Sequence, residues 1–372
     1  MNFLIVTHVI HIKNGADIVA YAPYVNEMNI WLKHVDKVTI IAPLKNGTLN
    51  AIHSKYEHKE INFIQVPSFS FTTPKEIFKA VFNIPFIFLK ILLAMASATH
   101  IHLRCPGNMG LLGSCAQIFF PKKSKTAKYA GNWDSKSQQP RSYNLQKWIL
   151  ANTFSTKNIK VLVYGDWKNQ TKNIKSFFTA TYFEKDKISV VPRTLNNLIE
   201  FIFVGSLSDG KQPLYAIQIV EELRKNGKQV RISLYGEGKQ HQKLSNYIQE
   251  NNLENFVQLK GNFDREEMKK VYQKSHFLIL PSKSEGWPKV VAEAMFWGCL
   301  PVSTPVSCVP DMFNFGERGL LLTEKIEIDV DKISDVLLNQ EEYNKKIKSA
   351  INWSRQFTID KFEQEIKNLL KS

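Results

Sequence analysis

Two glutamates at a spacing of eight residues, Glu285 and Glu293, stand in the part of the chain best suited to chemistry. Their segment reads PSKSEGWPKVVAEAMFWGCLPVSTP and follows the apolar run FLIL. A buried strand that ends at Pro281 would place Glu285 in the next loop and Glu293 on the helix after it. Carboxylates accept hydrogen bonds from the vicinal hydroxyls of a sugar or a ribose. The pair therefore predicts a carbohydrate or nucleotide ligand.

The beginning of that helix is also suited to binding an anion. Pro288 fits the first turn of a helix, where the N–H that proline lacks is not needed. The neighbouring backbone amides would then face a negative group, with the positive end of the helix dipole behind them. We therefore predict a donor-binding segment composed of Gly286, Trp287, Pro288, Lys289 and Val290.

The elements that position these residues follow from an alternation of short β-rich runs and helical patterns, which predicts parallel sheets covered by helices. A chain of 372 residues suits two such domains. The alternation restarts near residues 188–193, where a strand-like ISVVP precedes a polar TLNN. We expect domains at 1–192 and 193–350, and a C-terminal helix at 351–372 that packs back on the first domain. The expected strands are 3–8, 37–42, 61–66, 100–103, 127–130, 161–164, 201–204, 231–235, 257–259, 277–280 and 300–303, and the expected helices include 213–225, 239–250, 266–274 and 289–297.

The most apolar stretch covers residues 77–98. Lys79 and Lys90 interrupt it and Pro85 would bend it, so we do not expect a helix that spans a membrane. The first nine residues are interpreted as a buried strand, because they lack the basic leader and cleavage site of a signal peptide.

The basic residues are concentrated in the first half of the chain. Residues 1–200 contain 25 Lys/Arg and 11 Asp/Glu, whereas residues 201–372 contain 24 and 23. A basic half favours an anionic partner, and the candidates are an anionic membrane surface, a charged acceptor and nucleic acid. Nucleic acid is not expected, since no RNP, zinc-finger or helix-turn-helix signature accompanies the charge. A lysine-rich surface without a partner is the alternative.

No metal site is expected. The four cysteines form no zinc pattern with nearby histidines. The motif Asp329-Val330-Asp331 resembles a metal-binding D-x-D, but it occurs late in the chain, and Asp331 would suit a helix N-cap.

The residues around the two glutamates resemble the E-x7-E segment of the family 4 retaining glycosyltransferases, which have the GT-B fold. The resemblance rests on Glu285-x7-Glu293 followed by Ala294-Met295, Gly298 and Pro301-Val302. It extends to FVGSLSDGKQP (203–213), LYGEG (234–238) and VQLKGN (257–262), covers residues 190–320, and is fainter over the first half. It implies two Rossmann-like domains that face a cleft.

The resemblance also implies roles. Glu293 would bind the ribose hydroxyls, Glu285 the transferred sugar and Lys211 the diphosphate, while Gly205 and Gly236 let the backbone approach the nucleotide. No metal and no other cofactor is implied, because Lys211 and helix-terminal amides can stabilise the leaving diphosphate.

The chain departs from the family at two positions. Ser206 stands where the family commonly has an arginine, and Lys289 or Arg193 is a candidate replacement for that cation. Gly131-Asn132-Trp133 stands where the family has a histidine, so Asn132 and Asp134 become the catalytic candidates of the first domain.

Other residues of the first half are assigned to the acceptor or phosphate side. Gly15 corresponds to a Gly-Gly pair in a loop of the related enzymes, and Arg104 follows the fourth expected strand. His8 and His11 flank the end of the first strand and are interpreted as structural.

Together these features predict transfer of a sugar from a nucleotide diphosphate sugar to a glycan or lipid-linked acceptor, with retention of configuration, in cell-surface polysaccharide biosynthesis. The expected location is the cytoplasm, including the inner face of the membrane. A GT-B epimerase or phosphorylase is an alternative enzyme. A non-catalytic scaffold is the alternative outside enzymes: the two departures favour it, and the pair Glu285/Glu293 opposes it.

Overall fold

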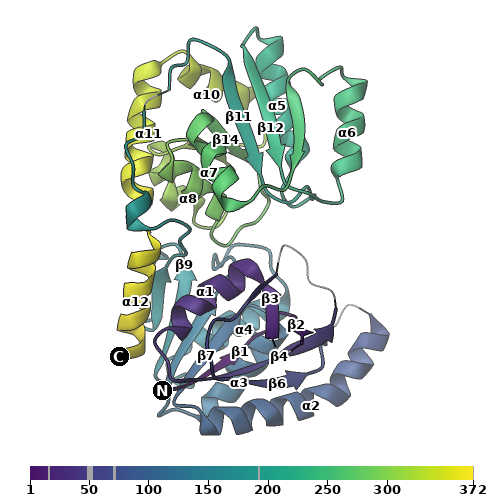
Figure 1. The fold of residues 1–372 in the computed structure, drawn as a ribbon, viewed down its shortest axis with the longest axis vertical. Helices are drawn as coiled ribbons and strands as arrows, with labels where there is room; N and C mark the ends of the chain where they lie inside the picture. Colours follow the sequence, from purple (N-terminus) through teal and green to yellow (C-terminus); the bar gives the residue numbers. More distant parts are fainter. Residues whose placement is uncertain (16, 48–52, 70–72, 192, 372) are drawn as a thin grey trace. The chain divides into compact units, whose positions relative to one another are not determined.

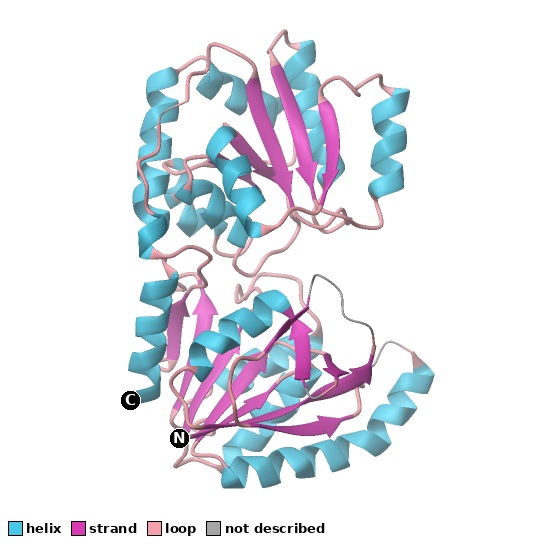
Figure 2. Ribbon diagram, viewed as in Figure 1, coloured by secondary structure: helices cyan, strands magenta, loops and turns pink. Residues whose placement is uncertain are grey.

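In the computed structural model the chain forms two compact units, each with its own sheet (Figures 1 and 2). The structure describes residues 1–15, 17–47, 53–69, 73–191 and 193–371. The first unit comprises Met1–Phe178 and Phe362–Ser372, and the second comprises Thr179–Lys361. The chain therefore enters the second unit before residue 192 and rejoins the first unit after residue 351, which corrects both expected boundaries.

The early change of unit has a packing cause. The ring of Tyr182 lies 5.0 Å from that of Phe296 and 5.1 Å from that of Trp297. The hydroxyl of Thr181 donates a hydrogen bond of 2.7 Å to Glu293. These contacts attach Thr181 and Tyr182 to the second unit, although no strand or helix pattern in the sequence predicts a domain boundary there.

A ten-stranded sheet forms the middle of the first unit. Its parallel part has the order β6-β4-β1-β7-β8-β9-β10, so the winding direction reverses between β1 and β7, as in a doubly wound sheet. Beyond β4, the strands β2, β3 and β5 extend it, with antiparallel pairing of β3 to both neighbours. The strands are β1 (Asn2–Val6), β2 (His11–Asn14), β3 (Asp17–Tyr21), β4 (Lys37–Asn46), β5 (His53–Lys55), β6 (Ile61–Val66), β7 (His100–Cys105), β8 (Ser124–Tyr129), β9 (Ile159–Tyr164) and β10 (Ile174–Phe177).

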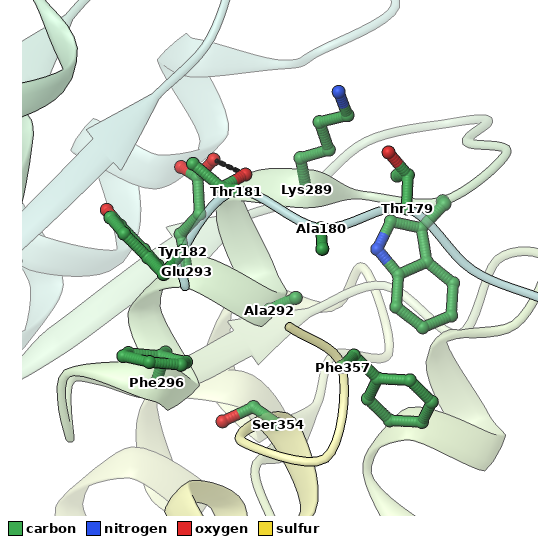
Figure 3. A pocket seen from close by; sticks show the side chains of 11 residues that line it. Thr179, Ala180, Thr181, Tyr182, Lys289, Ala292, Glu293, Phe296, Ser354 and Phe357 are labelled. Carbon is green, nitrogen blue, oxygen red and sulfur yellow. Dashed lines mark hydrogen bonds between the residues drawn. The ribbon is translucent and has the colours of Figure 1, made fainter. Parts of the chain in front are cut away.

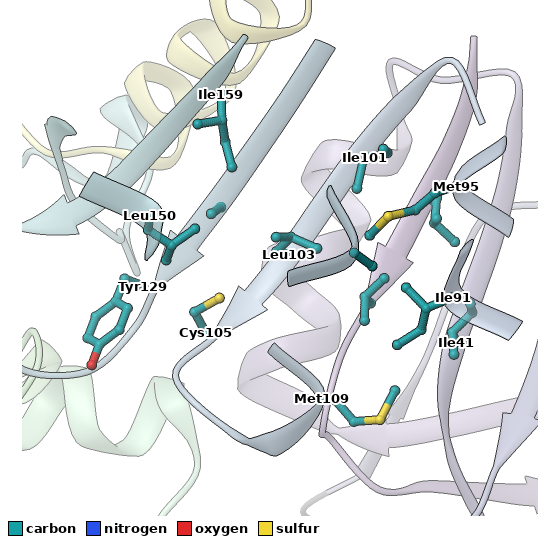
Figure 4. Close-up of a cluster of buried hydrophobic side chains, with 14 of the residues drawn as sticks. Ile41, Ile91, Met95, Ile101, Leu103, Cys105, Met109, Tyr129, Leu150 and Ile159 are labelled. Carbon is teal, nitrogen blue, oxygen red and sulfur yellow. The ribbon is translucent and has the colours of Figure 1, made fainter. Parts of the chain in front are cut away.

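Helices cover this sheet and bury its apolar strands. Because both faces are covered, β1 is a continuous apolar run, and Phe3, Leu4, Ile5 and Val6 are all fully buried. Figure 4 shows part of the core, where Ile91 and Met95 of α2 pack with Ile101 and Leu103 of β7 and with Ile41 of β4. The helices are α1 (Ala22–Leu32), α2 (Pro74–Ser97), α3 (Asn108–Ala116), α4 (Arg141–Ala151), the 3-10 turn Gln117–Phe119, and α12 (Ile359–Lys371) from Phe362 onward.

The helix α2 contains the apolar stretch noted in the sequence and is continuous through Pro85. By length and composition alone, Lys75–Ser97 could cross a membrane, since its most apolar 18-residue window has a mean hydropathy of 2.0. One of its faces, which includes Ala80, Ile87 and Ile91, is nevertheless buried in the first unit.

The second unit contains six parallel strands in the order β13-β12-β11-β14-β15-β16, which reverses its winding direction between β11 and β14. The expected strand Phe277–Leu280 and the expected helix Pro213–Lys225 have the same bounds in the structure. The expected strand ISVVP is irregular over its described residues. The strands are β11 (Ile199–Val204), β12 (Val230–Tyr235), β13 (Val257–Gly261), β14 (Phe277–Leu280), β15 (Leu300–Ser303) and β16 (Leu320–Leu321). The helices are α5 (Pro213–Lys225), α6 (His241–Glu250), α7 (Arg265–Lys274), α8 (Lys289–Phe296), α9 (Val309–Met312), α10 (Ile326–Leu337) and α11 (Gln340–Ser354), with 3-10 turns at Glu184–Asp186 and Asn314–Gly316.

Candidate functional site

The loops that follow β11 and β14 contact each other at the carboxyl edge of the second sheet. The side-chain amide of Gln212 donates to the carbonyl of Pro281 at 2.8 Å, and the backbone N–H of Lys283 donates to the carbonyl of Gly210 at 2.9 Å. These loops lie at the point where the winding direction reverses. In doubly wound sheets this point opens the crevice in which ligands bind.

Lys211 and Glu285 form an ion pair between these two loops. The lysine side chain is 29% exposed and the glutamate side chain is 9% exposed, so the cation is the more accessible partner. Two residues assigned separately from the sequence are thus in direct contact. A diphosphate that reached Lys211 would compete with Glu285 for the same ammonium group.

The loop after β11 is also held by the loop after β12. The N–H of Gly205 donates to the carbonyl of Tyr235 at 2.9 Å, and the N–H of Leu207 donates to the carbonyl of Glu237 at 3.0 Å. Gly236 has a φ of 139°, and a Cβ there would lie 1.9 Å from the carbonyl oxygen of Gly205. Only glycine fits this approach, so Gly205 and Gly236 meet at the same edge of the sheet.

Glu293 lies on α8 and bonds to two hydroxyl groups. Its Oε1 accepts from Thr181 at 2.7 Å (Figure 3), and its Oε2 accepts from Tyr272 at 3.0 Å. Tyr272 is fully buried, and burial together with the charge of Glu293 raises the pKa of its hydroxyl well above the usual range. The hydroxyl therefore remains a donor. Each carboxylate oxygen keeps a second lone pair that could accept from a ligand.

A small hollow adjoins Glu293, with Trp287 and Lys289 among its lining residues (Figure 3). The ring of Trp287 packs against Trp353 at 6.1 Å and Phe357 at 5.6 Å. Pro288 is the residue before the first helical residue, Lys289, rather than part of the first turn as expected.

The other predicted residues of this segment flank the same helix start. The carbonyl of Gly286 accepts from the hydroxyl of Ser307 at 2.9 Å, and Val290 is the second residue of α8. The helix N-terminus therefore follows the loop that carries Glu285.

Arg193 does not lie at this edge of the sheet. Its guanidinium donates to the carbonyls of Tyr272 and Trp297, each at 3.0 Å, and to those of Gln273 and Gly298. These carbonyls belong to the C-terminal ends of α7 and α8, where helix dipoles favour a cation. Arg193 is thus a structural residue and does not replace the family's missing arginine. Lys289 remains a candidate for that role.

The D-x-D motif is also structural. The carboxylate of Asp329 is buried and accepts from the N–H and hydroxyl of Thr323, the N–H of Glu324 and the hydroxyl of Tyr215, at 2.7 to 3.1 Å. Asp331 lies inside α10, which begins at Ile326, so it is not an N-cap as expected. Within the described ranges of the chain, no group of three or more His, Cys, Asp or Glu residues could hold a metal.

The first unit has a hollow of about 280 Å³ at its own reversal point, between the ends of β1 and β7. His8 and Asn108 line it, and a Cβ on Gly107 would lie 2.7 Å from Nδ1 of His8. His8 is exposed to solvent on one side, and the partial desolvation of its ring together with the charge of Arg104 lowers its pKa. This hollow was not predicted, although the Pro-Gly turn after a buried strand marks the same edge.

Asn132 and Asp134 lie in the loop after β8 and hold its turns. Oδ1 of Asn132 accepts the N–H of Asp134 at 2.9 Å, and Oδ1 of Asp134 accepts the N–H of Lys136 at 2.9 Å. Such bonds are typical of Asx turns. A catalytic role for the two residues stays a prediction.

The two residues assigned to the acceptor or phosphate side have different environments. Arg104 is partly buried over the ring of Tyr24 and donates to Glu27 at 3.0 Å, so its charge is already paired. Gly15 forms the exposed turn between β2 and β3 with a φ of 60°. The turn belongs to a hairpin that was not predicted, although Asn-Gly between alternating residues is a strong hairpin signal.

His11 is structural, as interpreted from the sequence. Its ring bonds to the carbonyl of Val9 and to the hydroxyl of Tyr56, each at 2.8 Å. Burial lowers the pKa of His11 to about 4.

The second unit resembles known proteins in sequence. Residues 184–353, which contain Lys211, Glu285 and Glu293, match the family model of glycosyl transferases group 1. An uncharacterised glycosyltransferase of Methanocaldococcus jannaschii is 28% identical over 161 residues, which cover 43% of this chain and 44% of the relative. An α-1,4-N-acetyl-D-galactosaminyltransferase of Campylobacter jejuni, named for a PP-undecaprenol-linked saccharide, is 26% identical over 167 residues, with coverages of 44% and 45%. The chain thus spans less than half the length of these relatives.

The likeness in fold covers the whole chain. The Anabaena protein HepE, solved with UDP and glucose, superposes with a TM-score of 0.70 at 14% identity, over 100% of this chain and 99% of that one. The predicted pair of Rossmann-like domains is confirmed. The chain has the GT-B fold, and residues 184–353 of its second unit are similar to the group 1 glycosyltransferases.

Proposed function

We propose that this protein transfers a sugar from a nucleotide diphosphate sugar to a glycan or lipid-linked acceptor, with retention of configuration and without a metal ion. The observation that carries the proposal is the ion pair of Lys211 and Glu285 at the reversal point of the second sheet. It combines a cation suited to a leaving diphosphate with a carboxylate suited to sugar hydroxyls.

In the proposed complex the ammonium group of Lys211 binds the diphosphate in place of Glu285, and Glu285 then accepts hydrogen bonds from the transferred sugar. The amides at the start of α8 face the same negative charge. Glu293, positioned by Thr181 and Tyr272, uses its remaining lone pairs for the ribose hydroxyls. Each contact then acts on a different part of the donor.

Retention is proposed from the resemblance to family 4 enzymes. The acceptor oxygen bonds to the anomeric carbon on the face from which the diphosphate leaves. The bond from that carbon to the phosphate oxygen breaks, and the acceptor proton passes to a phosphate oxygen. No metal is required, because Lys211 and backbone amides stabilise the negative charge.

The nature of the acceptor is proposed from the relatives. The Campylobacter enzyme is named for a saccharide on PP-undecaprenol, so a lipid-linked glycan of cell-surface polysaccharide assembly is the first acceptor to test. HepE was solved with UDP, so UDP is the first nucleotide to test. A lipid-linked acceptor places the reaction at the cytoplasmic face of a membrane, where the basic first unit would meet an anionic surface.

Calorimetric titration of UDP and other nucleoside diphosphates tests the site. Lys211→Ala should weaken the binding of the cognate nucleotide by about tenfold or more, since charge-assisted hydrogen bonds contribute about 1.5–3 kcal/mol. Glu285→Gln should keep or strengthen nucleotide binding, because the variant frees Lys211. Sugar transfer should nevertheless fall sharply, because the carboxylate that accepts hydrogen bonds from the transferred sugar is lost. Lys274→Ala, an exposed lysine at the far end of α7, is the matched control.

Two results would contradict the assignment. One is unchanged nucleotide affinity in a folded Lys211→Ala protein. The other is an equal loss of affinity in Lys211→Ala and Glu285→Gln. Product analysis separates the enzymatic alternatives: an epimerase would release nucleotide without an acceptor, and a phosphorylase would require free phosphate. A scaffold would bind donor without turning it over.

A further inference from the structure

Six lysines of the first unit line one hollow of about 740 Å³. The hollow lies where β8, β9 and β10 begin, at the edge of the sheet opposite the one that carries His8 and Gly107. The other lining residues are serine, threonine, asparagine and isoleucine, and no aspartate or glutamate is among the described lining residues. We call this hollow the lysine basin, and its lysines are Lys122, Lys125, Lys157, Lys160, Lys172 and Lys175.

The positive charges of the basin act on one another. Lys160 on β9 and Lys175 on the adjacent strand β10 repel, and the pKa of Lys160 is lowered by burial and by the charge of Lys175. Lys125 is buried and donates to the carbonyls of Gln117 and Phe120 at 3.2 and 2.9 Å. Burial lowers the pKa of Lys125 to about 8. A bound anion would relieve both effects, because an opposite charge favours the protonated lysine.

The end of α2 is attached to the same edge. Lys123, next to Lys122 of the basin, donates its ammonium protons to the carbonyls of Met95, Ala96 and Ala98 at 2.5 to 2.7 Å. These carbonyls lie at the C-terminal end of α2, where a cation is favourable. The basin and the last turn of α2 are therefore neighbours within the first unit.

The outer face of α2 carries a row of exposed apolar side chains, each between 52% and 68% exposed. Their spacing of three or four residues places them along one side of the helix, opposite the buried Ala80, Ile87 and Ile91. Lys90 lies over the ring of Phe86, 4.5 Å from its centre. We call this row the apolar stripe, and its members are Phe78, Phe82, Phe86, Leu89 and Leu93.

We propose that the lysine basin binds the phosphate headgroups of an anionic bilayer, and that the apolar stripe enters the interface of the same bilayer with α2 in the membrane plane. This inference rests on the proposed function, since it explains how the transferase meets a lipid-linked acceptor. A bilayer satisfies both features, because it offers negative charge at its surface and apolar volume beneath it. A soluble polyanion would leave the stripe in water, and a second copy of this chain would oppose one basic surface with another.

Vesicle sedimentation tests the proposal with the full chain, on neutral phosphatidylcholine vesicles and on vesicles with 30% phosphatidylglycerol. Binding should require the anionic lipid and weaken steeply with salt, because the attraction acts within about a Debye length. The basin variant replaces Lys122, Lys157, Lys172 and Lys175 by Gln and should bind at least about a hundredfold more weakly at low salt. The control variant removes the same charge at exposed positions near the other edge of the sheet: Lys13, Lys45, Lys136 and Lys168. It should lose far less.

Substitution of Phe78, Phe82 and Phe86 by Ser tests the stripe and should weaken the binding that remains at high salt. Nucleotide affinity is measured on the same samples and reports whether the variant is folded and its donor site is intact. A variant that fails to bind vesicles as expected can therefore be distinguished from a failure of the proposed function. Three results would overturn the inference. The first is an equal loss of vesicle binding in the basin and control variants. The second is a basin variant that no longer binds soluble polyphosphate but still binds vesicles, and the third is a vesicle-bound fraction that resists alkaline carbonate, which would make α2 a spanning helix.

Discussion

Replacing Tyr272 by phenylalanine should lower the free energy of unfolding of the second unit by the value of one hydrogen bond to a charged group. The change removes one hydroxyl that donates to Oε2 of Glu293 at 3.0 Å, and Tyr272 is fully buried. Water therefore cannot easily replace the lost donor. A hydrogen bond to a charged group contributes about 1.5–3 kcal/mol, so the free energy of unfolding should fall by about that amount. For a unit of this size the melting temperature should fall by about 3–10 °C.

Tyr343→Phe is the matched control, because the hydroxyl of Tyr343 is also buried but donates to a neutral acceptor, the carbonyl of His276, at 3.2 Å. It should cost only about 1 kcal/mol. Urea unfolding and scanning calorimetry measure both variants, and Glu293→Gln completes a double-mutant cycle that isolates the pair. If Tyr272→Phe cost no more than Tyr343→Phe, the tyrosine would not hold an ionised Glu293, and our account of how the ribose-binding carboxylate is positioned would be wrong.

Four further outcomes are expected. Gly236→Ala should lower stability and nucleotide affinity together, because its Cβ would lie 1.9 Å from a carbonyl oxygen; calorimetry checks both. Arg193→Ala should lower the melting temperature while a folded variant keeps its nucleotide affinity, and a selective loss of affinity would return Arg193 to the donor site. Sugar transfer should continue in the presence of a chelator. If the chelator abolished transfer and a divalent ion restored it, Lys211 would not be the group that neutralises the diphosphate. Burial lowers the pKa of His11 and His100 from 6.5 to about 4. Their contribution to the free energy of unfolding should therefore be complete above pH 6.5 and be lost progressively as the pH falls towards 4. Melting temperatures that do not change between pH 7 and 5 would contradict this.

Elements with strong local signals could be predicted from the sequence. β14 and β15 are short apolar runs with sharp ends, and α5 begins at a proline, so each has its expected bounds. The hairpin of β2 and β3 was not predicted: the resemblance assigned Gly15 to a loop, and the two strands are only four and five residues long. The boundary of the first unit was misplaced because it depends on the packing of Tyr182, which no local pattern records.

The members of the candidate site could be predicted, but not their pairing. Lys211 and Glu285 are 74 residues apart, and they meet because β11 and β14 are neighbours in the sheet. The role of Arg193 could not be inferred either, since its carbonyl partners come together only when the ends of α7 and α8 converge. Contacts of this kind depend on tertiary structure, which residue spacing does not contain.

The division of the chain also has a consequence for how the protein is made. Phe362 packs on Phe177 with ring centres 5.4 Å apart, and Ile366 is buried, so the first unit needs residues that are translated after the entire second unit. On the ribosome, the second unit can complete its core while the first still lacks a helix. Of the two units, the one whose larger part is translated first is therefore the last to complete its core. Until then, Phe177 and its neighbours are exposed to solvent and to chaperones.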